Sequence, residues 1–492
     1  MLRFVVALGA LCALFFAGDA WAETTGHATH ALSALKAGDT GQTILGRLNS
    51  VLGVVVMIGI AWLLSENKRK VDWRLVGMGT LLQLVFAALI LKTFAGRWVF
   101  EKANDAINSL LAFSDAGARF VFGNLIDLSV PVGAPLFQPG SASPVLEPQF
   151  WAFTGALIAF RILPTILFFS ALMAVAYHVG IMQIAVRGVA WVMQRTMRTS
   201  GPETLSAAGN IFLGQTEAPL LVKPYLETMT RSELMAVMAA GFATVAGGVL
   251  AAYVGMLQST FPDIAGHLLA QSVMGAPAAL VMAKIMVPAV DPLDPAAAGA
   301  LLDKLPAPVV DSKVAMKKMD ANVIDAITRG TSEGMLLAFN VGAMLITFIA
   351  IVAVINGIIG GVGGLFGIEH LSLERILGYV GAPIAFVIGV PWEDARVVGS
   401  LIGTKTVLNE FVAYQQLAGA LERGEIVHAK SAVIASYALC GFANFGSIGI
   451  QIGGIAAMAP SRRGDLARLG MMAMICGSLA TFQTAAIAAI VM

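Results

Sequence analysis

The stretch Asn210-Ile-Phe-Leu-Gly-Gln-Thr-Glu-Ala-Pro219 places two carboxamides, a hydroxyl and a carboxylate between long apolar segments. Holding the Glu217 carboxylate at membrane depth costs desolvation free energy, so an ionisable group at that depth indicates a functional site. Pro219 cannot donate a backbone N–H, so a helix that carries the acid is expected to be interrupted there. Broken helices at membrane depth are tolerated where they are buried in protein or line a cavity. The stretch therefore predicts solute binding inside a helical membrane protein.

The composition of the 492 residues agrees with a polytopic protein in a lipid bilayer. Hydrophobic residues make up 58% of the chain and charged residues 12%, whereas soluble domains average about 25% charged residues. The formal net charge of +1 gives no support to nucleic acid as a partner. The three cysteines all lie in apolar runs and form neither a disulfide framework nor a metal cluster.

The N-terminus has the pattern of a signal peptide over residues 1–22. Arg3 supplies the positive charge, Val5–Ala17 the apolar region and Ala20-Trp-Ala22 a small-residue cleavage site. An uncleaved short helix is the alternative. A polar segment, 23–47, follows and is expected on the extracytoplasmic side.

Residues 48–492 are expected to form one membrane domain with eight transmembrane helices. At roughly 20 residues per crossing, the apolar runs are 48–65, 76–95, 152–182, 235–257, 264–287, 335–360, 432–459 and 469–491. The interrupted stretches 203–230 and 378–420 are interpreted as two re-entrant hairpins. Residues 97–122 have aromatic side chains among charges and predict an interfacial helix, and 288–322 predicts a cytoplasmic linker.

Positive charge sets the predicted orientation. Lys68, Arg69, Lys70 and Arg74 follow the first span and should be cytoplasmic. The mature N-terminus is then outside, in a multi-pass protein of the plasma membrane. The segment 421–430 runs against the rule, because it falls outside and yet contains two basic residues.

An internal repeat accompanies the two hairpins. Gly241-Phe-Ala-Thr244 and Gly441-Phe-Ala-Asn444 are near copies, and each follows a hairpin with an acid, Glu217 in the first and Glu410 in the second. The predicted topology makes the two hairpins enter from opposite sides. Paired units of opposite orientation with interrupted helices are typical of secondary transporters, so we expect an all-α inverted repeat with two discontinuous helices.

From about residue 48 to its end, the sequence resembles the concentrative nucleoside transporter family, in its bacterial form. The motifs that carry the resemblance are Leu64-Ser-Glu-Asn-Lys-Arg69, Phe160-Arg-Ile-Leu-Pro164, Gly214-Gln-Thr-Glu-Ala-Pro219, Asn409-Glu-Phe-Val-Ala-Tyr414 and Ala438-Leu-Cys-Gly-Phe-Ala-Asn444. The resemblance implies a homotrimer in the bacterial inner membrane. It also implies inward symport of nucleosides with sodium or, in some members, protons.

The resemblance also implies which residues bind. The nucleoside ligands would be Gln215, Thr216 and Glu217 at the base, Phe442 packed on the base, and Glu410, Asn444 and Ser447 at the sugar. The sodium ligands would be the side chains of Asn210 and Thr244 and the carbonyls of Leu213 and Val245. Carboxylates suit sugar hydroxyls because charge-assisted hydrogen bonds are the stronger kind. No cofactor is expected besides sodium as coupling ion, and Gly214 leaves room for both purines and pyrimidines.

Simpler interpretations stay open at this stage. Either glutamate could pair with an intramembrane base, Arg161 or Lys405. The two asparagines could join helices, as is common in bundles, and Phe442 could be ordinary core packing. Proton coupling through a glutamate is the alternative to sodium.

An intramembrane enzyme and a passive channel are the competing functional classes. Gly330-Thr-Ser-Glu-Gly334 matches a nucleophile pattern, but that pattern needs a strand–turn–helix context with His and acid partners. The pattern instead lies at the start of an apolar helix, so we expect a carrier and no enzyme.

Overall fold

The computed structural model describes residues 44–127, 129–132, 135–136, 145–146, 150–153, 158–289, 320–368 and 371–492. The predicted signal peptide lies outside these ranges. So do the polar segment up to residue 43 and the predicted linker from residue 290 to residue 319.

The first half of the described chain contains the helices that precede and form the first repeat. In chain order they are α3 (Ile44–Leu63), α4 (Trp73–Lys92), α5 (Phe94–Phe122), η2 (Gly123–Ile126), η3 (Ile158–Ile162), α6 (Leu163–Val179), α7 (Ile181–Met197), α8 (Gly201–Gly209), η4 (Ala218–Tyr225), α9 (Arg231–Ala243), α10 (Gly247–Leu257) and α11 (Ile264–Met286). The predicted interfacial helix corresponds to α5.

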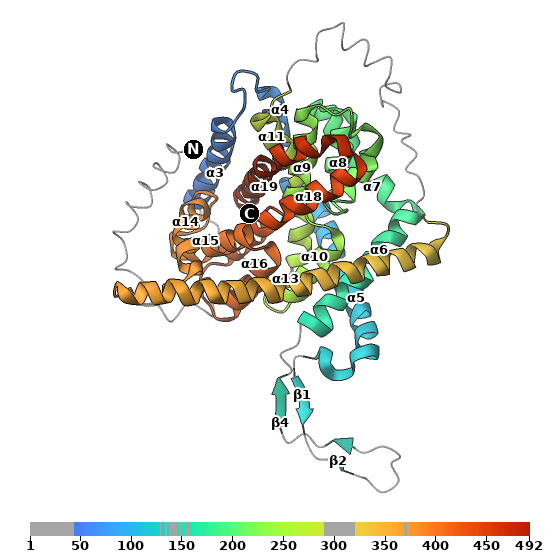
Figure 1. The fold of residues 1–492 in the computed structure, drawn as a ribbon, viewed down its shortest axis with the longest axis vertical. Helices are drawn as coiled ribbons and strands as arrows, with labels where there is room; N and C mark the ends of the chain where they lie inside the picture. The colour runs from blue at the N-terminus through green and yellow to red at the C-terminus, as the bar shows by residue number, and fades with distance from the viewer. Residues whose placement is uncertain are drawn as a thin grey trace.

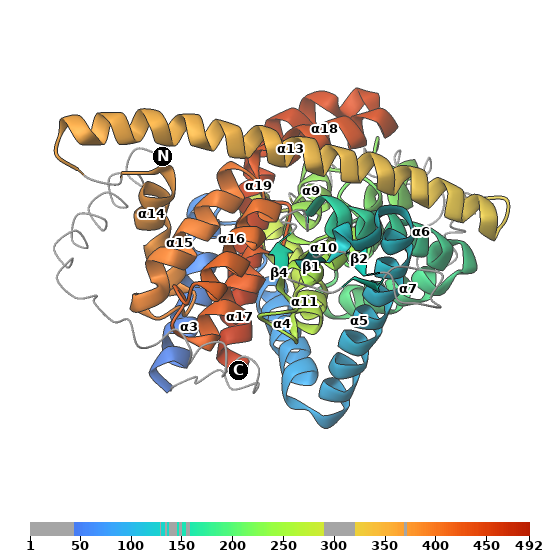
Figure 2. The same ribbon diagram turned by 90° about the horizontal axis from the view of Figure 1, so that it is seen from below.

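The second half begins with one very long helix. Its elements are α13 (Val323–Leu365), α14 (Leu373–Val387), α15 (Trp392–Val407), α16 (Glu410–Glu422), α17 (Ala429–Leu439), α18 (Phe445–Met458), η5 (Pro460–Arg462) and α19 (Arg463–Val491). Figure 1 shows α13 lying across the outside of the bundle, and Figure 2 shows the same from a perpendicular direction.

Seven of the predicted spans coincide with helical segments long and apolar enough to cross a membrane: Gly46–Leu63, Trp73–Lys92, Ile158–Val179, Arg231–Leu257, Ile264–Met286, Val323–Leu365 and Pro460–Val491. The eighth, 432–459, forms two shorter helices, α17 and α18, with a break at residues 440–444. The polytopic α-helical fold is thus confirmed. Of the residues in the apolar stretches, 89% are buried in Arg231–Leu257 and Ile264–Met286 but only 11% in α13, so the repeat region forms the centre.

The start of the third predicted span is wrong. Phe150–Phe153 is the strand β4, which pairs antiparallel with β1 (Ser129–Val132), and the helix begins only at Ile158. A second short ladder joins β2 (Pro135–Leu136) to β3 (Val145–Leu146). The aromatic run of β4 favours extended backbone, and Pro131 in β1 is tolerated because this strand pairs with β4 alone. Figure 1 shows these strands projecting away from the helices.

The second predicted hairpin is more complex than the range 378–420 suggested. α14 and α15 form a pair bent by 118°, and a second reversal at Leu408–Asn409 leads into α16. Gly389, with φ of 111°, supplies the left-handed backbone at the first bend. Pro391 then precedes α15 as its N-cap, since it cannot continue the helix before it.

The nucleophile-like pattern at residues 330–334 has a packing role. Ser332 Oγ donates to Thr328 O within α13, 2.9 Å away. A Cβ on Gly330 would lie 2.7 Å from Ala171 Cα, and one on Gly334 would lie 2.9 Å from Leu167 Cα. The two glycines therefore bring α13 against α6, as small residues four apart do in membrane bundles.

Candidate functional site

The same arrangement occurs in two units of the structure: a hairpin with an irregular apex is followed by a broken helix and then by a long helix. The first unit is α8 and η4, then α9 and α10, then α11. The second is α15 and α16, then α17 and α18, then α19. The candidate site lies where these two units meet.

The apex of the first hairpin rests against the break between α9 and α10. Gly247 N donates to Phe212 O at 3.1 Å. A Cβ on Gly214 would lie 3.5 Å from the Cβ of Ala246, so the two irregular segments touch at ordinary packing distance. The hairpin residues 210–217 and the break residues 244–246 thereby form one neighbourhood.

The N-terminal half of α18 faces this hairpin with polar side chains. Asn444, Ser447 and Gln451 are three and four residues apart and share one helix face. Gln215 Nε2 donates to Ser447 Oγ at 3.4 Å, and Gln215 Oε1 accepts from Gln451 Nε2 at 3.2 Å. The predicted base ligand Gln215 and the predicted sugar ligand Ser447 are therefore adjacent.

Glu410 lies at the N-terminus of α16 and is held from two sides. Its Oε1 accepts from Tyr253 Oη at 3.0 Å, and its Oε2 accepts from Asn444 Nδ2 at 2.9 Å. Tyr253 is itself stacked on Tyr414, with ring centroids 4.4 Å apart. The acid is only 6% exposed, and the positive end of the helix dipole favours a carboxylate there. Glu410, Asn444, Ser447 and Gln215 thus form one polar row.

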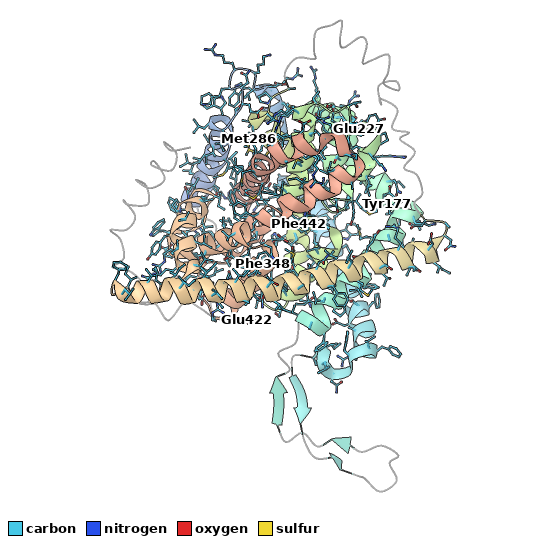
Figure 3. The ribbon with its side chains drawn as sticks, viewed as in Figure 1. Tyr177, Glu227, Met286, Phe348, Glu422 and Phe442 are labelled. Carbon is cyan, nitrogen blue, oxygen red and sulfur yellow. The ribbon has the colours of Figure 1, made fainter. Side chains whose placement is uncertain are left out.

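The remaining predicted nucleoside ligands border this row. Thr216 packs on α18, because a Cβ on Gly454 would lie 2.6 Å from Thr216 Cγ2. Glu217 is accessible, and its Oε2 accepts from Gly214 N within the first hairpin at 3.2 Å. Phe442 lies in the break before α18 and is only partly buried; Figure 3 shows it near the middle of the helical body.

The predicted sodium ligands lie at the ends of α8 and α9. Asn210 is completely buried and donates to Ser206 O at 3.1 Å, while its Oδ1 has no hydrogen-bond partner in the part of the chain that the structure describes. Thr244 is 1% exposed, and its hydroxyl donates to Ala240 O, so its lone pairs face away from that bond. Leu213 and Val245 belong to the irregular backbone beside these residues. The set offers oxygen donors suited to a hard cation.

The intramembrane bases have other partners. Arg161 Nη2 pairs with Asp115 Oδ2 at 2.8 Å. Lys405 Nζ donates to Ala438 O at 2.8 Å and to Thr481 Oγ1 at 3.2 Å. The simple ion-pair interpretation of the two glutamates is therefore not supported by the described bonds.

Sequence reasoning missed several polar residues around the site. Tyr253 and Gln451 contact predicted ligands, and Gln271 lies between the two helix breaks. A buried ion pair, Glu203 with Lys284 at 2.6 Å, joins the base of the first hairpin to α11. The available signal was a lone polar side chain in an apolar helix, which does not by itself reveal its partner.

Three family models match the chain. They are described as "Na+ dependent nucleoside transporter N-terminus" over residues 52–125, "Nucleoside recognition" over residues 159–260 and "Na+ dependent nucleoside transporter C-terminus" over residues 267–489. Together they cover most of the described helices.

Curated relatives agree with these models. The chain is 42% identical to "Uncharacterized transporter YutK" of Bacillus subtilis, over 89% of this chain and 98% of the relative. It is 38% identical to "Putative nucleoside permease NupX" of Escherichia coli, over 90% and 98%. Identity to "Solute carrier family 28 member 3" of Rattus norvegicus is 39%, over 92% of this chain and 59% of the rat protein.

Solved structures show the same fold. CNTnw in an inward-facing substrate-bound state superposes with a TM-score of 0.77 at 41% identity, over 90% of this chain and 97% of that one. A CNTnw variant in an outward-facing state gives a TM-score of 0.76 at 40% identity, over 90% and 97%. These matches are to transporters, which confirms the expectation of a carrier over an enzyme.

Proposed function

Because the chain belongs to the Na+ dependent nucleoside transporter family, we propose that it imports nucleosides across the bacterial inner membrane by sodium symport. The observation that carries the proposal is the polar row from Gln215 through Ser447 and Asn444 to Glu410. This row runs from the first unit to the second, and the buried Asn210 lies five residues before Gln215 in the first hairpin.

The row has the chemistry that a nucleoside requires at its two ends. Gln215 presents a donor and an acceptor on one carboxamide, which suits the edge of a base. Glu410 is a pure acceptor when ionised and suits ribose hydroxyls, to which it makes the stronger charge-assisted bonds. An analogue without the hydroxyl would leave the buried acid unpaired and would bind poorly. Phe442 supplies an apolar face beside these polar groups.

Sodium would be held at the ends of α8 and α9. The unpartnered Oδ1 of Asn210 and the hydroxyl oxygen of Thr244 are available as ligands, and the carbonyls of Leu213 and Val245 would complete the set. A cation is also favoured there because the C-terminal end of a helix carries partial negative charge. Bound sodium would fix the hairpin apex against the break and so raise nucleoside affinity.

Alternating access is supported by the solved states of CNTnw, which include inward-facing, outward-facing and intermediate forms. In the proposal the two hairpin units carry the nucleoside past a scaffold that includes α13. The chain would assemble as a homotrimer, with its mature N-terminus outside.

Proton coupling is the second candidate, and Glu217 is the observation that favours it. This carboxylate is accessible, and among the described bonds its only partner is the backbone N–H of Gly214. A carboxylate so lightly held can exchange a proton on each transport cycle.

Reconstitution in liposomes separates the candidates. Purified protein is tested for uptake of radiolabelled uridine and adenosine under an inward sodium gradient and, separately, under a proton gradient in choline buffer. We expect accumulation of both nucleosides above the external concentration with sodium alone. Uptake under the proton gradient and none with sodium would overturn sodium coupling; equilibration without accumulation would indicate a channel. Uptake of only one nucleoside would overturn broad selectivity.

A further inference from the structure

The two copies of the Gly-Phe-Ala motif, Gly241–Ala243 and Gly441–Ala443, touch each other at the centre of the molecule. Gly441 has φ of 134°, and a Cβ there would lie 2.7 Å from Phe242 O and 3.1 Å from the carbonyl carbon of Ala243. Gly477 of α19 makes a similarly close approach to Phe242. The backbones of the two helix breaks are therefore packed directly on one another.

Gln271 of α11 lies across this contact. It is fully buried, and its Nε2 donates to Ala243 O at 3.0 Å and to Cys440 O at 3.2 Å. The first carbonyl belongs to the last residue of α9, and the second follows the last residue of α17. One carboxamide thus satisfies a carbonyl that each helix break leaves without a partner in its own helix.

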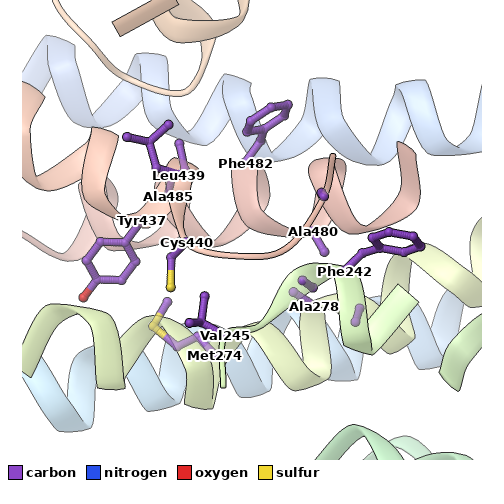
Figure 4. Packing of buried hydrophobic residues seen from close by; sticks show 14 of the residues in the cluster. Phe242, Val245, Met274, Ala278, Tyr437, Leu439, Cys440, Ala480, Phe482 and Ala485 are labelled. Atoms are coloured by element: carbon purple, nitrogen blue, oxygen red, sulfur yellow. The ribbon is translucent and has the colours of Figure 1, made fainter. Parts of the chain in front are cut away.

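The surroundings of Gln271 are shaped for this double contact. Gly275, one turn later on α11, lets the first break approach: a Cβ there would lie 3.1 Å from Ala243 O and 3.3 Å from Gln271 Nε2. Figure 4 shows Cys440 and Val245, one from each break, in the same view as Met274 of α11. The buried Oε1 of Gln271 has no hydrogen-bond partner among the described residues, so the side chain is used as a donor.

The two carbonyls that Gln271 binds are sequence neighbours of the proposed ligands. Ala243 directly precedes Thr244 and Val245 at the proposed sodium position. Cys440 is two residues before Phe442 and four before Asn444 at the proposed nucleoside position. A shift of either break changes the distance between its carbonyl and the shared carboxamide, and the second hydrogen bond carries that shift to the other break.

We propose that Gln271 is a positioning residue that couples the sodium position to the nucleoside position by binding both helix breaks at once. The inference rests on the proposed function, which supplies the two ligands. Coupling between sites is reciprocal, so sodium raises nucleoside affinity and nucleoside raises sodium affinity by the same factor. Such factors are typically about 5–150.

The test is nucleoside binding to purified full-length protein with and without sodium. The dissociation constant of radiolabelled uridine is measured in choline buffer and at saturating sodium, for wild type and for Gln271→Met, which keeps the volume and removes the donors. Gln83→Met is the matched control, because Gln83 is also fully buried but, among the described residues, its side chain donates only to Gly79 O in its own helix.

We expect Gln271→Met to lower the sodium enhancement of uridine affinity at least fivefold, with the sodium-free constant changed less than twofold. A purely structural defect would instead weaken both constants alike and keep their ratio. If Gln271→Met is not recovered as folded protein, Gln271→Leu, which also removes both donors, is measured in the same way. A wild-type enhancement that the recovered variant retains overturns the inference alone. A wild type that binds uridine without any sodium enhancement overturns the proposed coupling and the inference together.

Discussion

The two repeat units share a motif but break their helices at different points of it. In the first unit α9 continues through Gly241–Ala243, and Thr244 is the residue at its C-terminus. In the second unit α17 ends at Leu439, the Gly441–Ala443 segment is irregular, and Asn444 caps the N-terminus of α18. The equivalent residues Thr244 and Asn444 therefore lie at helix ends of opposite partial charge: Thr244 is at a negative C-terminus and Asn444 at a positive N-terminus.

This difference explains why the side-chain oxygen of Asn210 is unused in the first unit, whereas those of Asn409 and Asn444 in the second unit accept hydrogen bonds. Asn409 and Asn444 each use Oδ1 to accept the backbone N–H three residues ahead, as N-caps do. Asn210 follows the C-terminus of α8, where no free N–H is presented, and its Oδ1 is without a described partner. A helix C-terminus favours a cation, whereas an N-terminus favours a carboxylate such as Glu410. The helix ends thus suit the proposed sodium ligands of the first unit and the proposed sugar ligand Glu410 of the second.

The largest expected effect comes from removing the negative charge of Glu410 in the second unit. Glu410→Gln should lower kcat/KM for uridine roughly 100-fold, because hydrogen bonds to a charged group contribute about 1.5–3 kcal/mol each. The kcat/KM is measured as uridine uptake into liposomes at a fixed sodium concentration. Glu422→Gln, at the exposed end of the same helix, should match wild type. Wild-type uptake by the Glu410 variant would show that the Glu410 carboxylate does not bind the nucleoside.

Removing the Asn210 side-chain oxygen in the first unit should weaken sodium binding instead of nucleoside binding. Asn210→Ala should raise the sodium concentration for half-maximal uptake roughly 20-fold, since a lost polar ligand costs about 1–3 kcal/mol. The nucleoside KM at saturating sodium should change little. Asn104→Ala on α5 is the control, because Asn104 is also buried with an unpartnered Oδ1 among the described residues. A change confined to nucleoside KM would contradict the proposed role of Asn210 as a sodium ligand.

A smaller effect should follow from separating the units. Gly454→Ala on α18 places a methyl group 2.6 Å from Thr216 Cγ2, and overpacking of this kind costs about 1–3 kcal/mol. We expect the KM for both uridine and adenosine to rise roughly fivefold as the first hairpin moves away from α18. Gly453→Ala is the matched control, since a Cβ there meets no atom within 4 Å. Equal behaviour of the two variants would show that the contact between Thr216 and α18 is not used.

The sequence located most helices because their apolar runs are long enough to span a bilayer. The predictions from sequence were wrong where the same local pattern is compatible with more than one secondary structure. The aromatic run Phe150–Phe153 suits an apolar helix or a strand, and its partner β1 decided for the strand. The range 378–420 contained two reversals, and the left-handed Gly389 marks the one that hydropathy did not separate.

By itself, the sequence determined an α-helical membrane protein with two interrupted units, because apolar length, proline position and buried acids are properties of the chain. It also singled out Asn210, Gln215, Glu410 and Asn444 as unusual polar groups in apolar surroundings. Only the tertiary structure decided which of them meet, since Gln215 and Ser447 are 232 residues apart and join across packed helices. Gln271 is a lone polar residue in an apolar helix, and its role could not be predicted from that signal, because it depends on two carbonyls that helix breaks in separate units bring to one carboxamide.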